Sequence, residues 1–315
     1  MLQFTSTVLF LSLCRSSLAQ LGAGGQDCSG GEPEACLTNT AIYSVSEEAE
    51  CENAYDCCLC AKIICGPGCE SFEASGDYSA FGVPDINVTG TLSEGASIEC
   101  SGFLACSEAF ITGEYIEEVK CTEVGSCYRT GMALTCLESD PCPIECSGAA
   151  ACEEAEIQAE FASSVTCEEA VSCEEATMLL SITDPEFTIE CQKDTSCHNS
   201  TFVIVTAGGV MGPIKCEESG ACLDATIGFI NFGTDPLLVQ ELDCSEAGAC
   251  TGLSIGVGDT VAPIVILECK CATPLCSEVT FSEGVTCLSY DYDTDGDDDD
   301  YSGDDYSGDD DDDDY

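Results

Sequence analysis

Apolar positions recur along residues 96–288 in a fixed relation to cysteine. An apolar residue stands two positions before the first Cys of each unit, and another stands five positions after the second Cys. A spacing of two places both side chains on the same face of a β-strand. The pattern therefore predicts short strands that face one core. The first column is Ile98, Val119, Ile144, Val165, Ile189, Ile214, Leu242, Leu267 and Val285, and the second is Ile111, Met132, Ile157, Met178, Phe202, Ile227 and Ile255.

The unit that carries these columns repeats throughout this region. The first cysteines of successive units, from Cys100 to Cys287, lie 18 to 28 residues apart. Such a period with short strands and no helical periodicity is typical of a solenoid. We predict an all-β fold, a right-handed parallel β-helix of about 8 coils, stacked about 4.8 Å apart. A leucine-rich horseshoe has a similar period, but its L-x-x-L-x-L core is missing from the sequence.

Cysteine spacing predicts the covalent framework. The chain has 29 Cys, and 28 remain without Cys14, eight in residues 28–69 and twenty in residues 100–287. Two Cα atoms six residues apart on a straight strand are separated by about 20 Å, whereas a disulfide needs about 7 Å or less. Each C-x5-C pair can therefore close only if the residues between turn; pairing between stacked coils is the alternative. We favour bonds within the coil: Cys100–Cys106, Cys121–Cys127, Cys146–Cys152, Cys167–Cys173, Cys191–Cys197, Cys216–Cys222 and Cys244–Cys250.

The cluster CCLCAKIICGPGC at residues 57–69 leaves two readings open. Cys57, Cys58, Cys60, Cys65 and Cys69 could hold a metal as thiolates, but zinc sites usually have paired C-x2-C spacings. Irregular spacing in an exported chain favours disulfides.

The flanks predict export. Residues 1–19 resemble a signal peptide, with the apolar run VLFLSL at 8–13 and small residues before Gln20. No segment is long enough to span a membrane. Residues 20–95 form a Cys-rich N-terminal region, 96–288 the repeats and 289–315 an Asp-rich tail that we expect to be disordered. We therefore expect a secreted, extracellular protein, with the cell wall as one setting.

The net charge limits the classes of partner that the chain can bind. There are 60 Asp and Glu against 7 Lys and Arg, and the net charge is −53. Such a surface repels nucleic acid and anionic membranes, and attracts divalent cations, mineral or cell-wall surfaces and basic proteins or polyamines. If the coils stack, the pairs Glu153–Glu154, Glu168–Glu169 and Glu174–Glu175 form one close carboxylate array that suits Ca²⁺. The few cations stand at scattered repeat positions, which argues against a lyase that binds acidic polysaccharides.

The tail is a second acidic element, with 15 Asp in residues 291–315. Its start matches the first half of an EF-hand loop, but position 12 is Ser302 instead of Glu. We therefore expect weak, multivalent Ca²⁺ binding and no other cofactor. The candidate ligands are Asp291, Asp293, Asp295, Asp297 and Asp299.

The remaining candidate chemistry is sparse. His198 is the single histidine, and it occupies a repeat position whose residue varies between coils, which indicates surface decoration. We therefore expect no catalytic residues and no enzyme activity. Asn87 and Asn199 begin N-x-T sequons and are candidate glycosylation sites.

The unit [VIL]-x-C-x4-[AS]-C over about 96–288 resembles secreted cysteine-rich proteins of diatoms and related microalgae. The Asp tail is similar to those of acidic biomineral-associated proteins, and the composition is similar to that of frustulins, the calcium-binding proteins of diatom walls. The resemblance implies a wall or extracellular setting and supplies no site residues. We expect a structural or interaction protein that binds Ca²⁺ or mineral weakly; the alternative is a carbohydrate-binding or carbohydrate-modifying β-helix.

Overall fold

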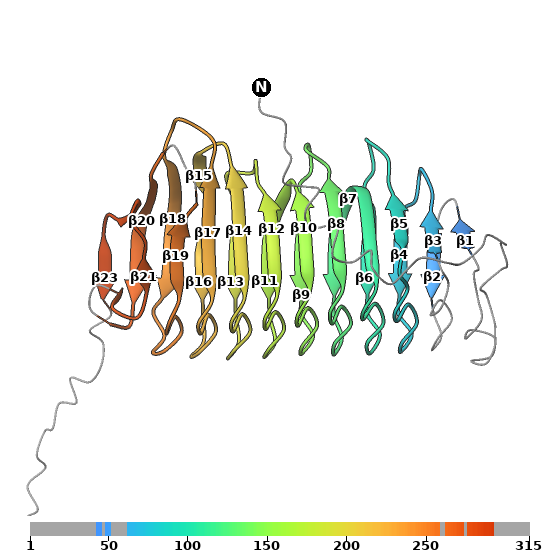
Figure 1. The fold of residues 1–315 in the computed structure, drawn as a ribbon, viewed down its shortest axis with the longest axis horizontal. Helices are drawn as coiled ribbons and strands as arrows, with labels where there is room; N and C mark the ends of the chain where they lie inside the picture. Colours follow the sequence, from blue (N-terminus) through green and yellow to red (C-terminus); the bar gives the residue numbers. More distant parts are fainter. Residues whose placement is uncertain (1–41, 46–47, 52–61, 259–261, 274–275, 293–315) are drawn as a thin grey trace, which may run out of the picture.

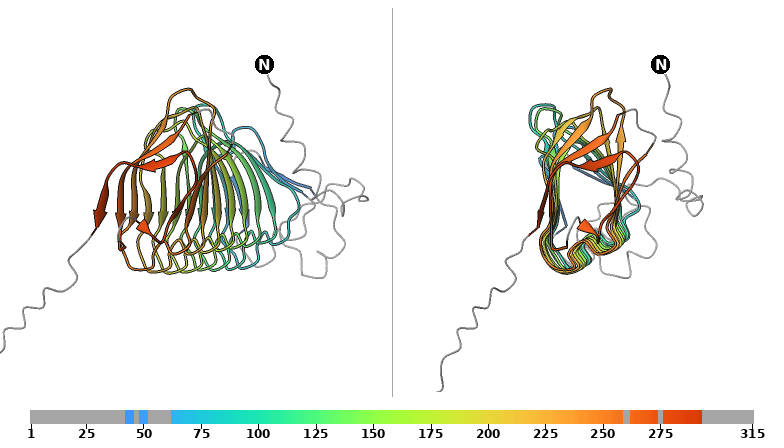
Figure 2. Two further views of the ribbon diagram at one scale, coloured as in Figure 1. Left: turned by 60° about the vertical axis from the view of Figure 1, so that its left-hand side comes forward. Right: turned by 90° about the vertical axis from the view of Figure 1, so that its left-hand side faces the viewer.

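The computed structural model describes residues 42–45, 48–51, 62–258, 262–273 and 276–292. Over these residues the chain is an all-β parallel solenoid of about nine turns, so the predicted parallel β-helix is confirmed. The strands stack along the long axis of the molecule (Figure 1), and successive coils superimpose when they are seen along that axis (Figure 2).

Each coil contributes one strand to each of two faces, here called face A and face B. Face A contains the strands that end at the first Cys of a unit or at the residue paired with it. They are β2 (Glu48–Cys51), β4 (Ser71–Ala74), β6 (Ala96–Cys100), the end of β7 (Phe110–Cys121), β9 (Cys142–Cys146), β11 (Ala162–Cys167), β13 (Thr188–Cys191), β16 (Ile214–Cys216), the ends of β18 (Leu237–Cys244) and β20 (Ile264–Cys271), and β23 (Tyr290–Tyr292). Face B contains β1 (Ile42–Val45), β3 (Lys62–Cys65), β5 (Ile86–Thr89), the start of β7, β8 (Gly131–Cys136), β10 (Glu156–Glu160), β12 (Thr177–Ser181), β14 (Thr201–Thr206), β17 (Thr226–Asn231), β19 (Ser254–Val257) and β21 (Thr280–Phe281). Four successive coils add strand between the faces. β15 (Gly209–Met211) pairs with the start of β18, the start of β18 pairs with the start of β20, and the start of β20 pairs with β22 (Val285–Cys287).

The core is built from the two apolar columns. In face A, Ile144 pairs with Val165 and Val165 pairs with Ile189, and all three are fully buried. In face B, Ile157 pairs with Met178 and Met178 pairs with Phe202, and they are buried as well. Alternating burial along the strands leaves the intervening side chains on the outside.

The last two members of the first column are placed differently from the prediction. Cys269 pairs with Leu242, whereas Leu267 is 38 % exposed and Val285 pairs with Ile264 in another part of the coil. The sequence I-L-E-C-K-C contains two overlapping candidates for the start of the repeat, L-E-C ending at Cys269 and C-K-C ending at Cys271, and both have strand parity. Because β20 aligns with β18 over its whole length, the second match, ending at Cys271, is the one in register.

The solenoid also extends further than predicted at both ends. Strands β1 to β5 lie before residue 96 and pair in the same parallel arrangement, so this part of the N-terminal region belongs to the repeat. At the other end, the first residues of the tail form β23, which pairs with β20. Residues 293–315 lie outside the described residues.

Coil length varies at one corner, where face B leads back to face A. The two shortest coils pass this corner through a single residue with positive φ, Tyr115 (58°) or Phe161 (63°), at an irregularity in the ladder. A longer coil inserts residues 137–141, and the Cys136–Cys142 disulfide closes this insertion. The opposite corner, which contains the seven predicted C-x5-C pairs, keeps a constant length from Cys100–Cys106 to Cys244–Cys250.

Candidate functional site

Disulfides fix the constant corner, which we call the cystine turn. The structure contains each of the seven bonds that the C-x5-C spacing predicts, from Cys100–Cys106 to Cys244–Cys250, with Cα–Cα distances of 5.7 to 6.0 Å. The sulfur atoms of Cys216, Cys222 and Cys250 lie within 4.8 Å of one another. Cys216 is bonded to Cys222 and Cys250 to Cys244, so these sulfur atoms are not thiolates and do not form a metal site.

Two residues with positive φ shape each turn. In the coil after Cys146 they are Ala150 (56°) and Glu154 (54°), four and eight residues after the first Cys. Local bonds close the turn, with the Ala151 N–H donating to Gly148 O (3.0 Å), and the Cys152 N–H donates to Ser172 O of the next coil (2.6 Å). Because this pattern repeats, side chains beside the turn emerge in register from coil to coil.

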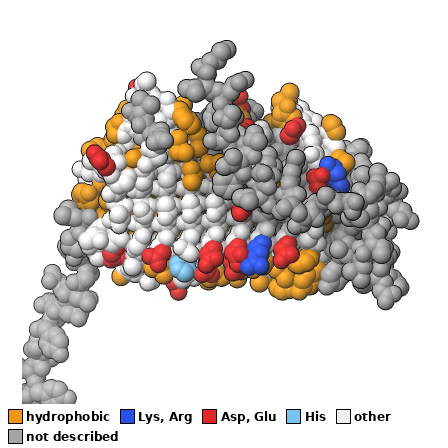
Figure 3. All heavy atoms as spheres, viewed as in Figure 1, with side chains coloured by type: hydrophobic (Ala, Val, Ile, Leu, Met, Phe, Trp, Pro, Cys, Tyr) orange, Lys and Arg blue, Asp and Glu red, His pale blue; other side chains and the backbone are white. Residues whose placement is uncertain are grey.

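The trailing row consists of the two residues after the second Cys of each turn. Its members, in coil order, are Ser107–Glu108, Tyr128–Arg129, Glu153–Glu154, Glu174–Glu175, His198–Asn199, Leu223–Asp224 and Thr251–Gly252. Backbone bonds join neighbours directly, since the Glu154 N–H donates to Glu174 O (2.8 Å) and the Glu175 N–H donates to His198 O (2.9 Å). Acidic side chains form a line along this edge in the space-filling view (Figure 3).

Charge within the trailing row is only partly balanced. Arg129 makes a two-pronged bond to Glu154 (2.7 and 2.8 Å), which lowers the pKa of that carboxyl. His198 Nδ1 lies 2.7 Å from Glu174 Oε1. Partial burial, followed by the charges of Glu174, Glu154 and Glu175, raises the pKa of Glu153. The middle of the row is therefore a place where added positive charge relieves repulsion.

The leading row consists of the two residues after the first Cys. Here burial, followed by the charges of Glu145, Glu169 and Glu190, raises the pKa of Glu168. Lys193 pairs with Glu218 of the next coil (2.7 Å).

The single carboxylate array expected from the sequence is therefore wrong. The groups that act on Glu168 differ from those that act on Glu153, so the carboxylates form two separate clusters. The two pairs lie on different limbs of the cystine turn, since Glu168–Glu169 follows Cys167 and Glu174–Glu175 follows Cys173.

The lysines are also less scattered over the repeat positions than we expected from the sequence. Lys120, Lys215 and Lys270 occupy the same position on face A, directly before the first Cys, and Lys215 stands between Glu190 and Asp243 in the ladder. The cations in the described part of the chain form ion pairs: Lys62–Asp85, Lys120–Glu118, Arg129–Glu154, Lys193–Glu218, Lys215–Glu190 and Lys270–Glu241. Most of these pairs link one coil to the next.

Both sequons lie on or beside face B. Asn87 is half-buried on β5, and its amide donates to Thr112 Oγ1 (3.2 Å) while Thr89 Oγ1 donates to Asn87 Oδ1 (3.1 Å). Asn199 is exposed in the trailing row and has positive φ (57°). Asn199 is therefore the more accessible of the two sequon residues.

Several predicted residues fall outside the described residues: Asp293, Asp295, Asp297 and Asp299 of the tail, and Cys57, Cys58 and Cys60. Asp291 belongs to β23, where its backbone pairs with Lys270. Cys65 and Cys69 are bonded to each other, so these two cysteines form a disulfide and not a metal site.

Sequence reasoning missed one complete cystine-type turn. Ala74 and Ala80 occupy the two Cys positions, and both are fully buried. The signal was present, since F-E-A-S-G-D-Y-S-A at 72–80 shares the E-x-S-G of I-E-C-S-G-F-L-A-C at 98–106 and differs at the two Cys positions and at four other residues. A search anchored on Cys cannot find a turn that has none.

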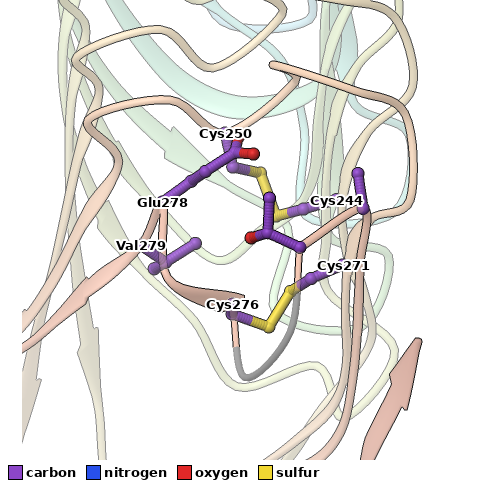
Figure 4. Close-up of a pocket in the computed structure, with 8 residues that line it drawn as sticks. Cys244, Cys250, Cys271, Cys276, Glu278 and Val279 are labelled. Carbon is purple, nitrogen blue, oxygen red and sulfur yellow. A yellow bond between two sulfur atoms is a disulfide. The ribbon is translucent and has the colours of Figure 1, made fainter.

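The last coils close with bonds of different spacing, Cys271–Cys276 and Cys269–Cys287. The first of these lies beside Cys244–Cys250 at a small opening that also includes Glu278 and Val279 (Figure 4). The side chains fill this opening and leave no room for a ligand.

Fold and site together define a class: a disulfide-rich parallel β-solenoid with charged rows on either side of a covalently closed turn. Its many disulfides suggest an oxidising, extracellular environment. No protein-family model, curated protein or solved structure matches the chain. Among the described residues, no helix has the length and apolar character needed to cross a membrane.

Proposed function

We propose that the protein is a secreted structural or interaction protein of an extracellular matrix or cell wall. It binds Ca²⁺ or mineral surfaces weakly through the two acidic rows and the Asp-rich tail, and it has no catalytic role. The observation that carries this proposal is the register of the carboxylates, which the stacked turns repeat at the spacing of the coils.

The centre of the cation-binding surface is the Glu153–Glu174 region. Partial burial and then the charges of neighbouring carboxylates raise the pKa of Glu153, so a bound divalent cation stabilises the ionised form. Carboxylate oxygens are the ligands that Ca²⁺ prefers. No enclosed cage surrounds these groups, and open sites of this kind bind Ca²⁺ with dissociation constants of about 1 mM. Repetition along the row and in the tail supplies avidity for a surface that presents cations.

A rigid scaffold suits this role. A disulfide in each turn adds about 2 kcal/mol of stabilisation per closed loop, although such contributions do not simply add. The rows therefore keep their spacing when they contact a solid, and little conformational entropy is lost on binding.

Calorimetric titration with Ca²⁺ tests the proposal on the intact chain, on the chain without residues 291–315, and on a Glu153→Gln/Glu174→Gln variant. We expect the deletion and the double substitution each to remove part of the binding heat. Glu94→Gln serves as the matched control, because Glu94 is exposed in a turn away from both rows. Equal heats for the double variant, the control and the intact chain would reject the acidic rows as the binding surface.

A carbohydrate-binding role is the second candidate, and one observation favours it. Three aromatic rings meet at the first turns: Tyr78 lies 5.3 Å from Phe103 and 5.8 Å from Phe81, edge to face, and Phe103 is 39 % exposed. Aromatic rings beside an acid such as Asp77 can stack on a sugar. Binding of soluble oligosaccharides that is lost in Phe103→Ala would favour this function over the first.

A further inference from the structure

One part of face B is a run of adjacent strands whose outward residues are uncharged. We call it the neutral face, and it comprises the outward residues of β12, β14, β17, β19 and β21. They are Thr177, Leu179 and Ser181; Thr201, Val203 and Val205; Thr226, Gly228 and Ile230; Ser254 and Gly256; and Thr280. In Figure 3 the area over β14 and β17 shows white and orange side chains, above the acidic line.

The absence of charge from this face is unexpected for so acidic a chain. Asp and Glu number 60 in the sequence, and the neighbouring strand β10 presents Glu156 and Glu160 at the corresponding outward positions. None of the residues that define the neutral face is charged. A solubilising surface would carry charge here too, so this composition points to an uncharged partner.

The neutral face is also a regular lattice. Thr177, Thr201, Thr226, Ser254 and Thr280 pair in one ladder across five coils, so a hydroxyl recurs at each coil. The repeat is about 4.8 Å between coils and about 6.6 Å between alternate residues along a strand. The strands lie nearly parallel to one another (Figure 1), whereas sheets of this many strands ordinarily twist.

Its side chains are stiff and short. Thr, Val and Ile are restricted at χ1, and Gly228 and Gly256 add no side chain. Disulfides close the turn that leads into each strand, from Cys167–Cys173 to Cys271–Cys276. The face therefore holds its geometry before binding, which lowers the entropic cost of contact with a rigid partner.

We propose that the neutral face binds ice. The water molecules at an ice surface are uncharged, and they repeat at lengths close to those of this lattice. A Thr hydroxyl can replace a surface water in its hydrogen bonds, while the adjacent methyl groups and the Val203–Val205 patch bury apolar area against the crystal. Repetition over five coils makes the contacts multivalent.

Other occupants fit less well. Mineral surfaces need charged ligands, and the residues that define the face include neither charges nor the aromatic rings that stack on sugars. A second copy of the chain would bury about 400 Å² of this face, estimated from five strands and five residues, which is half of the about 800 Å² per partner in a standard interface.

The test measures inhibition of ice recrystallisation by the full disulfide-bonded chain, before and after enzymatic removal of N-glycans, because Asn199 lies just before β14. Thr201→Tyr places a bulky ring at the centre of the face. Thr166→Tyr is the matched control, since Thr166 is outward on β11 of face A, between Glu145 and Glu190. Circular dichroism and Ca²⁺ titration of both variants confirm that the fold and the acidic rows are unchanged.

We expect the intact chain to inhibit recrystallisation. The Thr201→Tyr variant should need about tenfold more protein for the same inhibition, because the contact with the lattice is lost. The Thr166→Tyr variant should inhibit as well as the intact chain. Three outcomes would overturn the proposal: no inhibition by the intact chain, equal loss in both variants, or no effect of Thr201→Tyr. Adsorption of the intact chain to crystalline cellulose without ice activity would overturn it in favour of a polysaccharide partner, and a dimer that Thr201→Tyr dissociates would do so in favour of self-association.

Discussion

The turn that has Ala in both Cys positions allows the stabilisation by one cystine turn to be measured. Ala74 pairs with Cys100, and the Ala80 N–H donates to Ala105 O (2.7 Å), just as the Cys106 N–H donates to Ser126 O (2.7 Å). Tyr78 has positive φ at the position of Leu104 in the next coil. We therefore expect Ala74→Cys/Ala80→Cys to form a disulfide without rearranging the backbone.

The magnitude follows from loop closure in the unfolded chain. A bond that closes residues 74–80 removes about 8 cal/mol/K of chain entropy, which is about 2 kcal/mol at 25 °C. Solenoids unfold coil by coil, so a global midpoint would dilute this effect. Hydrogen exchange at the Ala80 and Gly82 amides, which bond to Ala105 O and Ser107 O, reports the coil itself. Their protection should rise about 30-fold, because a factor of ten corresponds to about 1.4 kcal/mol.

Mass spectrometry of non-reduced digests provides the control for bond formation. Free thiols, or peptides joined to Cys100 or Cys106, would show that this turn lacks the geometry of the others. A correctly formed bond with unchanged exchange would refute the loop-closure reasoning, since crowding of the two added sulfur atoms would then cancel the entropic gain.

Three further outcomes follow from burial and charge. Leu242→Asp should abolish folding, whereas Leu267→Asp should change the free energy of unfolding by less than about 0.5 kcal/mol. The reason is that the Leu242 side chain is buried and the Leu267 side chain is exposed. The yield of folded protein and urea unfolding measure the difference between the two variants. Glu153→Gln should stabilise the protein at neutral pH. Because the pKa of Glu153 is raised in the folded chain, ionisation of this carboxyl destabilises the folded state progressively as pH rises through that pKa. The gain in stability should vanish below about pH 4, which thermal unfolding at several pH values measures. Lys215→Met should cost no more than about 1 kcal/mol, and less in high salt, because its pair with Glu190 is solvent-accessible; equal loss at both salt concentrations in urea unfolding would contradict this reasoning.

Much of the fold was predictable because its signals are strong and local. Strand parity at positions such as Ile144 and Ile157 identifies the core face, and C-x5-C spacing fits a tight turn better than a straight strand. Strand parity alone could not decide whether Leu267 or Cys269 belongs to the buried column, since both lie an even number of residues from Cys271. Only the pairing of β20 with β18 along its whole length resolves the register.

The candidate site was less predictable. Glu168 and Glu174 are close in sequence, but they follow different cysteines of the Cys167–Cys173 turn, and Glu174 acts on Glu153 whereas Glu168 is affected by Glu145, Glu169 and Glu190. The neutral face was missed for another reason. Periodicity arguments follow the buried residues of a strand, and the outward Thr177 and Thr201 become a pattern only when the register aligns them.

The variable corner has a consequence for how the chain can change. Insertions such as residues 137–141 lengthen a coil without altering the cystine turn or either face, because they lie where the strands of face B return to face A. Evolution can therefore add or remove residues at this corner freely while the outer surfaces keep their spacing. The same freedom makes residues 138–140 a site for grafting a tag or a second binding module onto the scaffold.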